Sequence, residues 1–508
     1  MDRSARRSRS LTRSLASPAL VVLAWLAAPA ATALAGAQPG VAPVSPAAEA
    51  RPFTAQLDAL LGVPGGLTAE QVALRAEETS FDVAARRHEI AAAASEVDRA
   101  LVAYLPRLAL SASYARYSSV DQPAIGNVVA APGVPPGPLP AGAALVAGPV
   151  VFPDVVDSSR FQAGVSVPLS DYLAVLPGRR ESADRLERAA RLRERATRLE
   201  TAKDARLAYY AWVRSRLQEV VAAQSVDDAR RHLADVGLAF EAGTASRADV
   251  LRVESQLADA ELLLTRSRNL TAVTEDQLRN VMHDEPSSPY AIGDELQVPD
   301  GEGAVPDDLA AQVADARRRR LEVAVFDELA PSYRAQAAAT RAGAVPRLAA
   351  FGDVLSANPN ERVIPAQDRF DTTWNVGVAL SWAPNDLADA RAAAEGLDAR
   401  ASQSEADKAR FLDALRAEVV AARQALADAR ASLGTSARRL AAAEESYRVR
   451  RLLFRNGSAT SVELTDAETD VTEARLAAIH ARVDVRSAAV RLEHATGADV
   501  DSSAAFVD

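Results

Sequence analysis

The chain repeats itself, and this repeat restricts its fold more than any other feature of the sequence. The segment FEAGTASRADVL at residues 240–251 and the segment FRNGSATSVELT at residues 454–465 each follow a long helical pattern. In both segments a phenylalanine precedes a glycine by three residues, and a carboxylate follows that glycine by six. Since internal repeats decide the architecture before any local prediction does, we expect two halves of similar structure.

The similarity extends to the segments before these turns. LPRLALSASY (105–114) matches VPRLAAFGDV (345–354), and FQAGVSVPLSD (161–171) matches WNVGVALSWAPND (374–386). Each half therefore has the same predicted order: a helix, a strand, a loop, a strand, a very long helix, a glycine turn and a return helix. The first half carries extra residues in its loop, whose Pro/Gly/Ala/Val composition indicates irregular structure.

These matches predict the divisions of the chain. We expect a signal peptide at 1–35, a Pro/Ala-rich segment at 36–66, a first repeat at 67–287, a linker at 288–307, a second repeat at 308–497 and a tail at 498–508. The first repeat should hold strands at 106–117 and 158–170 around a loop at 118–157, a long helix at 179–240 and a tip turn at 241–247. The second should hold strands at 346–355 and 371–383, a long helix at 387–456 and a tip turn at 457–461.

The first 35 residues have the composition of a secretory signal peptide. Five arginines within positions 3–13 precede the apolar run ALVVLAWLAAPAA and the small residues Ala33-Leu34-Ala35, as in a signal sequence and its cleavage site. Beyond this segment no run approaches the ~20 apolar residues of a spanning helix, so we expect any membrane crossing to use strands.

Composition argues against several functional classes. The chain has no cysteine, which excludes disulfides and thiolate metal sites. Its five histidines are scattered without a ligand spacing, and its net charge of −10 argues against nucleic acid as a partner. We therefore predict no enzymatic activity, no cofactor and no bound metal.

The strand at 371–383 is predicted to have one apolar face. Along it, smaller or polar residues alternate with large apolar ones, which are Trp374, Val376, Val378, Leu380 and Trp382. Aromatic residues at the ends of an apolar band are typical of strands that face lipid, so Phe161, Trp374 and Trp382 are predicted to form a lipid-facing girdle. A soluble sheet that packs on another sheet fits the alternation equally well. Four strands, however, are too few to close either structure alone, so we expect several protomers to pool their strands.

The long helices indicate a tube. From residue 179 to 236 there is neither proline nor glycine, and from 387 to 456 only Gly396 and Gly434 interrupt the pattern. At 1.5 Å per residue each helix would be roughly 90–100 Å long. Apolar residues from Leu412 to Leu440 follow the 3-4 spacing of a coiled coil. The shorter helices, stacked end to end, would match the long ones in length, which suits a wall of equal staves.

The signal peptide, the two halves, the entry segment LPRLALSASY and the turn with a carboxylate six residues after its glycine together resemble the TolC family of bacterial outer-membrane efflux channels. The resemblance covers about residues 65–497. It implies a mainly α fold with a small membrane β part. Long antiparallel α-helical coiled coils would form a trimeric α-barrel that is continuous with a 12-stranded β-barrel, to which each protomer contributes four strands.

The resemblance also implies partners and a location. The chain would act as a homotrimer in the cell outer membrane, in contact with outer-membrane lipid, and extend into the periplasm. It would be the passive exit duct of a tripartite efflux or type I secretion system, working with a periplasmic adaptor protein and an inner-membrane pump. Its cargo would be small molecules, metals or proteins.

In the resembling channels the periplasmic tips carry the turns that dock the adaptor. Carried over to this sequence, the docking positions are Phe240, Gly243, Phe454 and Gly457. A glycine just past a helix end and a Ser/Thr with an acidic residue three positions later are also a plain structural device, in which glycine adopts a left-handed conformation and a capping box starts the next helix. Both turns fit that description.

The resemblance further implies an acidic constriction at the tips. Its positions here are Asp249, Glu463 and Asp466, of which the first two have a complete explanation as capping-box residues. Asp466 has none, and a threefold axis would gather its carboxylates with those of Glu463. The second turn lacks the arginine often found two residues after its glycine, so Arg247 and Arg252 are the candidate ion-pair partners of a cation-attracting, pH-sensitive gate.

Another class of function fits part of the sequence. A non-conducting periplasmic coiled-coil adaptor or envelope spacer protein would have similar long hairpins, although an adaptor should also have a lipoyl-like β domain. The run Arg317–Arg320 could suggest an anionic partner, but we interpret it as a solvated helix face.

Overall fold

The computed structural model describes residue 57 and residues 59–120, 126–135, 137–149, 154–285, 289–296, 308–364 and 366–500. The predicted signal peptide lies outside these ranges, as do most of the Pro/Ala-rich segment and of the linker, and part of the loop predicted at 118–157.

The protein is mainly helical. Its helices are α2 (Ala69–Thr79), α3 (Phe81–Val102), α4 (Asp171–Ala174), α5 (Leu176–Glu241), α6 (Arg247–Met282), α7 (Leu309–Arg319), α8 (Leu321–Ala342), α9 (Asp386–Arg455) and α10 (Ser461–Thr496). Its strands are β1 (Arg107–Arg116), β2 (Asn127–Ala130), β3 (Val146–Pro149), β4 (Asp157–Val167), β5 (Arg347–Asn358) and β6 (Asp371–Ser381). Helices α5 and α9 contain 66 and 70 residues, or roughly 100 Å each.

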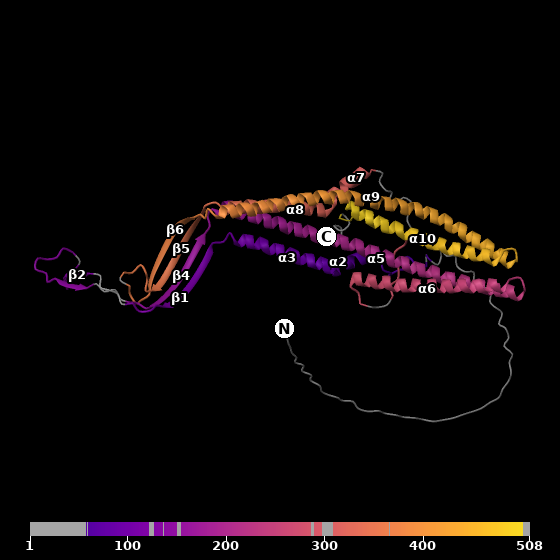
Figure 1. Ribbon diagram of the computed structural model, residues 1–508, viewed down its shortest axis with the longest axis horizontal. Coiled ribbons are helices and arrows are strands. Elements are labelled where there is room, and N and C mark those ends of the chain that lie inside the picture. Colours follow the sequence, from indigo (N-terminus) through magenta and orange to yellow (C-terminus); the bar gives the residue numbers. More distant parts are fainter. Residues whose placement is uncertain are drawn as a thin grey trace, which may run out of the picture. The chain divides into compact units, whose positions relative to one another are not determined.

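The long helices are flanked by shorter ones (Figure 1). Next to the sheet, α5 packs against α3 on one side and α8 on the other, and α8 packs against α9. Farther from the sheet, α5 packs against α6 and α10, and α10 packs against α9. The helices therefore form a layer in which α9 lies along one edge and α3 and α6 lie along the other.

The four longer strands form one antiparallel sheet in the order β1-β4-β5-β6. The register pairs Leu110 with Ala163, Ala163 with Val354, and Val354 with Trp374, so these side chains share one face. The large apolar side chains of that face are exposed in a single chain, and Val376 of β6 is 74% exposed. The predicted alternation is thus present, and its apolar face has no cover within the described part of one chain.

Two glycines of the matched strand segments leave room on the opposite face. A side chain at Gly164 would collide with the Asp353 carboxylate of β5. At Gly377 a Cβ atom would lie 3.0 Å from the ring of Phe351, which is also tighter than normal contact. Both positions therefore use glycine because a neighbouring strand places a large side chain over them.

The structure departs from the sequence prediction in the loop of the first half. Strands β2 and β3 form a two-stranded antiparallel hairpin within the segment that we expected to be irregular. The two strands, NVVA and VAGP, have only four residues each, and the Pro/Gly-rich composition around them favoured the prediction of a loop.

The first helix of each half is also divided, where we predicted one continuous helix. Ser80 ends α2 and begins α3, because its hydroxyl accepts the N–H groups of Asp82 and Val83. Arg320 stands at the matching break between α7 and α8. It is only 7% exposed and donates to Glu322 and Glu418, so the solvated face that we predicted for Arg317–Arg320 is wrong at this residue.

The main core lies where the two halves meet around the middle of α5. Tyr209 and Trp212 are fully buried there with Leu217, Leu278 and Ile479. The core is mainly apolar, and its buried hydroxyls of Ser215 and Thr274 hydrogen-bond to each other at 2.7 Å, so hydrophobic burial is the main force that fixes α5 against its neighbours.

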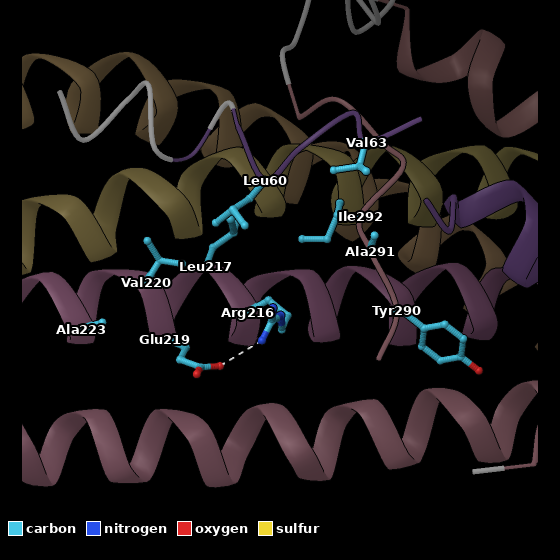
Figure 2. Close-up of a pocket in the computed structure, with 10 residues that line it drawn as sticks. All are labelled: Leu60, Val63, Arg216, Leu217, Glu219, Val220, Ala223, Tyr290, Ala291 and Ile292. Carbon is cyan, nitrogen blue, oxygen red and sulfur yellow. Dashed lines mark hydrogen bonds and ion pairs between the residues drawn. The ribbon is translucent and has the colours of Figure 1, made fainter. Parts of the chain in front are cut away.

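Segments before α2 and after α6 cover this core. Figure 2 shows Leu60, Val63 and Ile292 beside Leu217 of α5, around an open pocket of about 270 Å³. Its polar lining includes the Arg216–Glu219 ion pair of α5, at 3.3 Å. The pocket marks where the connecting segments pack on the core.

No helix in the described ranges has both the length and the apolar character needed to cross a membrane.

Candidate functional site

The two glycine turns join the long helices to the return helices. Gly243 has a φ of +76° and Gly457 a φ of +71°, the left-handed region that favours glycine. In the first turn Thr244 N–H donates to the Ala239 carbonyl at 2.8 Å, and in the second Ser458 N–H donates to the Leu453 carbonyl at 2.8 Å. These bonds satisfy carbonyls at the ends of α5 and α9 that the helices themselves leave free.

Both return helices begin with a complete capping box, as predicted. The Ser246 N–H donates to the Asp249 carboxylate at 2.9 Å, and the Asp249 N–H donates back to the Ser246 hydroxyl. Thr460 and Glu463 repeat this arrangement, with 2.8 Å from the Thr460 N–H to the carboxylate. Hydrogen bonds from the Ser246 hydroxyl and N–H lower the pKa of Asp249, and those from the Thr460 N–H and hydroxyl lower the pKa of Glu463.

Replacement of Gly457 by alanine is expected to destabilise the helical hairpin of α9 and α10 by about 1–2 kcal/mol, because an L side chain strains a left-handed residue. Gly434 is the matched control: it lies inside α9 with open space around it, so Gly434→Ala should stabilise the helix by about 0.5–1 kcal/mol. Denaturant titrations followed by helical circular dichroism measure both. Shifts of the same sign would contradict the assigned backbone conformations.

The two matched phenylalanines of the turns differ in their surroundings. Phe454 packs with Val236, Val250 and Val253 of the first half and places its ring edge-on to His232 at 5.6 Å between centroids. Phe240 is 43% exposed. Phe454 therefore joins the hairpin of α9 and α10 to that of α5 and α6, whereas Phe240 is exposed and available to a partner.

Asp466 lies exposed on α10 and makes no hydrogen bond or ion pair with any described residue. Arg247 and Arg252 are exposed at the start of α6. Within the described part of one chain neither arginine forms an ion pair with Glu463 or Asp466. A single chain therefore brings the predicted gate residues to one end of the helical layer but does not join the acids to the arginines.

The predicted girdle residues lie on the exposed apolar face of the sheet. Trp374 and Trp382 stand at the two ends of the apolar row of β6, and Trp382 donates its indole N–H to the Ala344 carbonyl at 3.2 Å. Phe161 of β4 contacts Phe370, with 5.9 Å between the ring centroids and the rings tilted at 38°. An aromatic residue with an anchored N–H at the strand end suits a polar boundary.

Sequence reasoning missed a buried polar cluster behind the tips. His232 of α5 contacts Glu468 of α10, and Asp228 of α5 pairs with Arg475 of α10 at 3.2 Å. One signal was present: Glu468 and Arg475 fall on the apolar 3-4 spacing of α10 that Leu464 and Val471 define. A charged residue at such a position predicts a buried partner, although not which one.

Known proteins that are similar to this chain are found among solved structures. No curated protein sequence matches the chain. Among solved structures, the outer-membrane channel OprN has a TM-score of 0.67 at 18% identity and covers 88% of this chain and 92% of its own. The Campylobacter jejuni CmeC outer membrane channel has 0.65 at 12%, with 87% and 90% covered, and the outer membrane protein VceC from Vibrio cholerae has 0.64 at 14%, with 87% and 96% covered.

These likenesses establish the fold over nearly the whole described chain. The model of the outer membrane efflux protein family matches residues 72–282 and 311–498, and the two matched ranges correspond to the two repeats. Together they make up well over half of the sequence. The chain therefore belongs to the outer membrane efflux protein family, whose members are channels of the outer membrane and not enzymes.

Proposed function

We propose that three copies of this chain assemble into an outer-membrane channel-tunnel that serves as the passive exit duct of a tripartite efflux or type I secretion system. A periplasmic adaptor protein and an inner-membrane pump would deliver the cargo, which is a small molecule, a metal ion or a protein. The observation that carries the proposal is that one chain has two pairs of unpaired edges, one pair in the sheet and one pair in the helical layer, and that the two edges of each pair suit each other.

The sheet supplies the first pair of edges. Strands β1 and β6 each have one neighbouring strand among the described residues, and an unpaired edge is a template for pairing with another chain. If β1 of one copy pairs with β6 of the next, three copies close a ring of twelve strands. The apolar face that carries Leu110, Val376 and Leu380 would then point outward to lipid.

The helical layer supplies the second pair. Exposed leucines and valines lie along the edge of the layer that α3 and α6 form. They are Leu101 and Val102 on α3 and Leu262, Leu270 and Val273 on α6. Packing this edge against α9 of the next copy would bury them and continue the layer into a tube. An adaptor or spacer protein does not need an exposed apolar strand face, so this face favours the channel over those two classes of protein.

The tips supply a surface for the adaptor. Leu238 and Phe240 are exposed at the end of α5, and Leu452 at the end of α9. Beside the second turn, Val449, Leu453, Ser458 and Glu463 line an open groove of about 420 Å³ between α9 and α10. Because apolar residues concentrate where long helices end, we assign Phe240, Gly243, Phe454 and Gly457 to the docking region, with Phe454 in a supporting role.

The carboxylates would form the constriction. Glu463 and Asp466 lie three residues apart on α10, so a threefold axis would gather six negative charges if this face lines the lumen, and Asp249 is the matching acid of the first turn. Arg247 and Arg252 of a neighbouring copy are the ion-pair partners in this arrangement. Such a ring attracts cations and binds divalent ions more strongly than monovalent ones.

Conductance across a planar lipid bilayer tests the proposal. We expect the purified, unheated protein to open in steps, to prefer cations and to be blocked by calcium. A bilayer that stays silent although protein has inserted would reject the conducting role and leave a sealed or structural protein.

The substitution Asp466→Asn should weaken the calcium block. It removes half of the six carboxylates, and we expect the half-blocking calcium concentration to rise on the order of ten-fold, which corresponds to ~1.4 kcal/mol. Asp98→Asn is the control, because Asp98 is an exposed carboxylate of α3, near the sheet rather than the tips. An unchanged block in Asp466→Asn would remove this residue from the gate.

A further inference from the structure

Exposed apolar residues gather where the sheet meets the helices, and we call them the junction collar. They are Leu105, Leu169 and Leu173 in the first repeat and Val345, Trp382 and Leu387 in the second. Leu105 and Val345 begin the matched segments LPRLALSASY and VPRLAAFGDV. Leu169 and Trp382 follow the matched strand glycines at the same distance, and Leu173 and Leu387 are as far apart as the two tip glycines. Both repeats therefore carry the collar.

Two matching hydrogen bonds hold the collar in place. Tyr172, which precedes Leu173, donates its hydroxyl to the Tyr104 carbonyl at 2.7 Å. Trp382 donates its indole N–H to the Ala344 carbonyl at 3.2 Å. Tyr104 and Ala344 occupy matching positions, each directly before the first collar residue of its repeat. In both repeats an aromatic side chain just after a strand is thus anchored to the backbone just past the end of a helix.

A copy that pairs at the edges of the chain does not reach the middle of the collar. Strand β4 pairs with β1 and β5, and α5 packs against α3 and α8. The stretch between β4 and α5 therefore has both lateral neighbours within one chain, yet its residue Leu173 is 87% exposed. Val345, between α8 and β5, is flanked in the same way and is 46% exposed. A different partner must meet these side chains.

The collar continues the apolar face of the sheet. Leu169 stands two residues after Val167, the last residue of β4, and Trp382 stands two residues after Leu380 of β6. Side chains at every second residue of a strand share a face. Because Trp382 is bonded to the residue before Val345, the apolar surface runs on from the strands to the starts of the helices. A continuous apolar surface of this kind marks a site of interaction with protein or membrane.

The polar groups beside the collar suit phospholipid headgroups. Arg179 is exposed on the first turn of α5, and its side chain forms no hydrogen bond or ion pair with a described residue. Arginine binds phosphate well. Tyrosine and tryptophan favour the boundary between acyl chains and water, because one end of each side chain is apolar and the other is polar. Aromatic, aliphatic and cationic groups at one level favour a lipid surface over a protein.

We propose that the junction collar lies in the headgroup boundary of the periplasmic leaflet of the outer membrane. Lipid contact then extends past the ends of the strands to α4 and to the first turn of α9. The membrane thereby holds the joint between the sheet and the helices, and not the sheet alone. This placement rests on the proposed function in one respect, which is that the apolar face of the sheet points outward to lipid.

Thiol labelling of the protein in phospholipid nanodiscs, which leave both sides open to water, tests this placement. The chain contains no cysteine, so Leu173→Cys and Val345→Cys each introduce a single thiol. Leu238→Cys, at the exposed end of α5, is the reference in water. Val376→Cys and Asn375→Cys report on the two faces of β6. The reagent is a charged maleimide, which does not enter the acyl region.

We expect Leu173→Cys and Val345→Cys to label about ten-fold or more slowly than Leu238→Cys. Only the thiolate reacts, and apolar surroundings raise the pKa of a thiol, so that each unit lowers the rate about ten-fold. Val376→Cys should be protected as well, whereas Asn375→Cys should label near the reference rate. A fluorophore attached to the Leu173→Cys thiol in urea before folding should lose emission in lipids with brominated acyl chains, and one at Leu238→Cys should not.

The outcomes separate the collar from the channel. Fast labelling of Leu173→Cys beside a protected Val376→Cys would overturn the collar and leave the lipid-facing sheet. Fast labelling of both would reject the lipid-facing sheet of the proposed channel together with the collar. Slow labelling of Leu173→Cys without quenching by brominated lipid would mean that protein covers this position, which also overturns the proposal.

Discussion

Replacement of Val376 by arginine is expected to destabilise the folded sheet strongly in the outer membrane. Val376 stands in the middle of the apolar row of β6 and is largely exposed in one chain. If that face contacts lipid, a charge near the bilayer midplane costs about 2–4 kcal/mol per chain, and three chains would bear it together. Urea titration of the protein folded into lipid vesicles measures the loss.

The neighbouring residue provides the control. Asn375 points to the opposite face of β6, where its partner in the register is Asp353 of β5. Asn375→Arg therefore introduces the same charge beside a carboxylate and away from lipid, and we expect a change within about 1 kcal/mol. Equal losses from Val376→Arg and Asn375→Arg would mean that the apolar row packs against protein, as in a soluble sheet.

Local signals explain why the tips were predictable. A left-handed residue favours glycine, and a helix start needs an acceptor for its free N–H groups. The sequence therefore encodes Gly457, Thr460 and Glu463 within seven residues of one another. The apolar row of β6 was predictable for a similar reason, because strand periodicity is a property of consecutive residues. Its lipid-facing role still depends on neighbouring chains.

Long-range contacts explain what the sequence could not reveal. His232 and Glu468 are 236 residues apart, and neither has a neighbour in the chain that predicts the other. Arg320 belongs to a run of four arginines and looks solvated, yet it is buried because α9 brings Glu418 to it. The gate residues remain predictions for a related reason, since Arg247 and Asp466 meet only if another copy supplies one of them.

Replacement of Trp212 by alanine should be the most costly change in the helical part of the chain. The indole ring is fully buried in the main core, 5.8 Å from the ring of Tyr209 and 6.2 Å from that of Tyr290. Both halves of the chain and the segment after α6 meet at this point. Removing a large aromatic side chain from a core costs about 3–5 kcal/mol, because the cavity left behind adds to the lost burial.

Trp212→Phe separates packing from hydrogen bonding. The buried indole N–H of Trp212 has no hydrogen-bond partner among the described residues, so phenylalanine gives up no bond and removes an unsatisfied donor. We expect Trp212→Phe to cost about 1–2 kcal/mol, well below Trp212→Ala, in the midpoint of denaturant unfolding. If the two variants were equally unstable, the indole nitrogen would have to carry a bond that holds the core together.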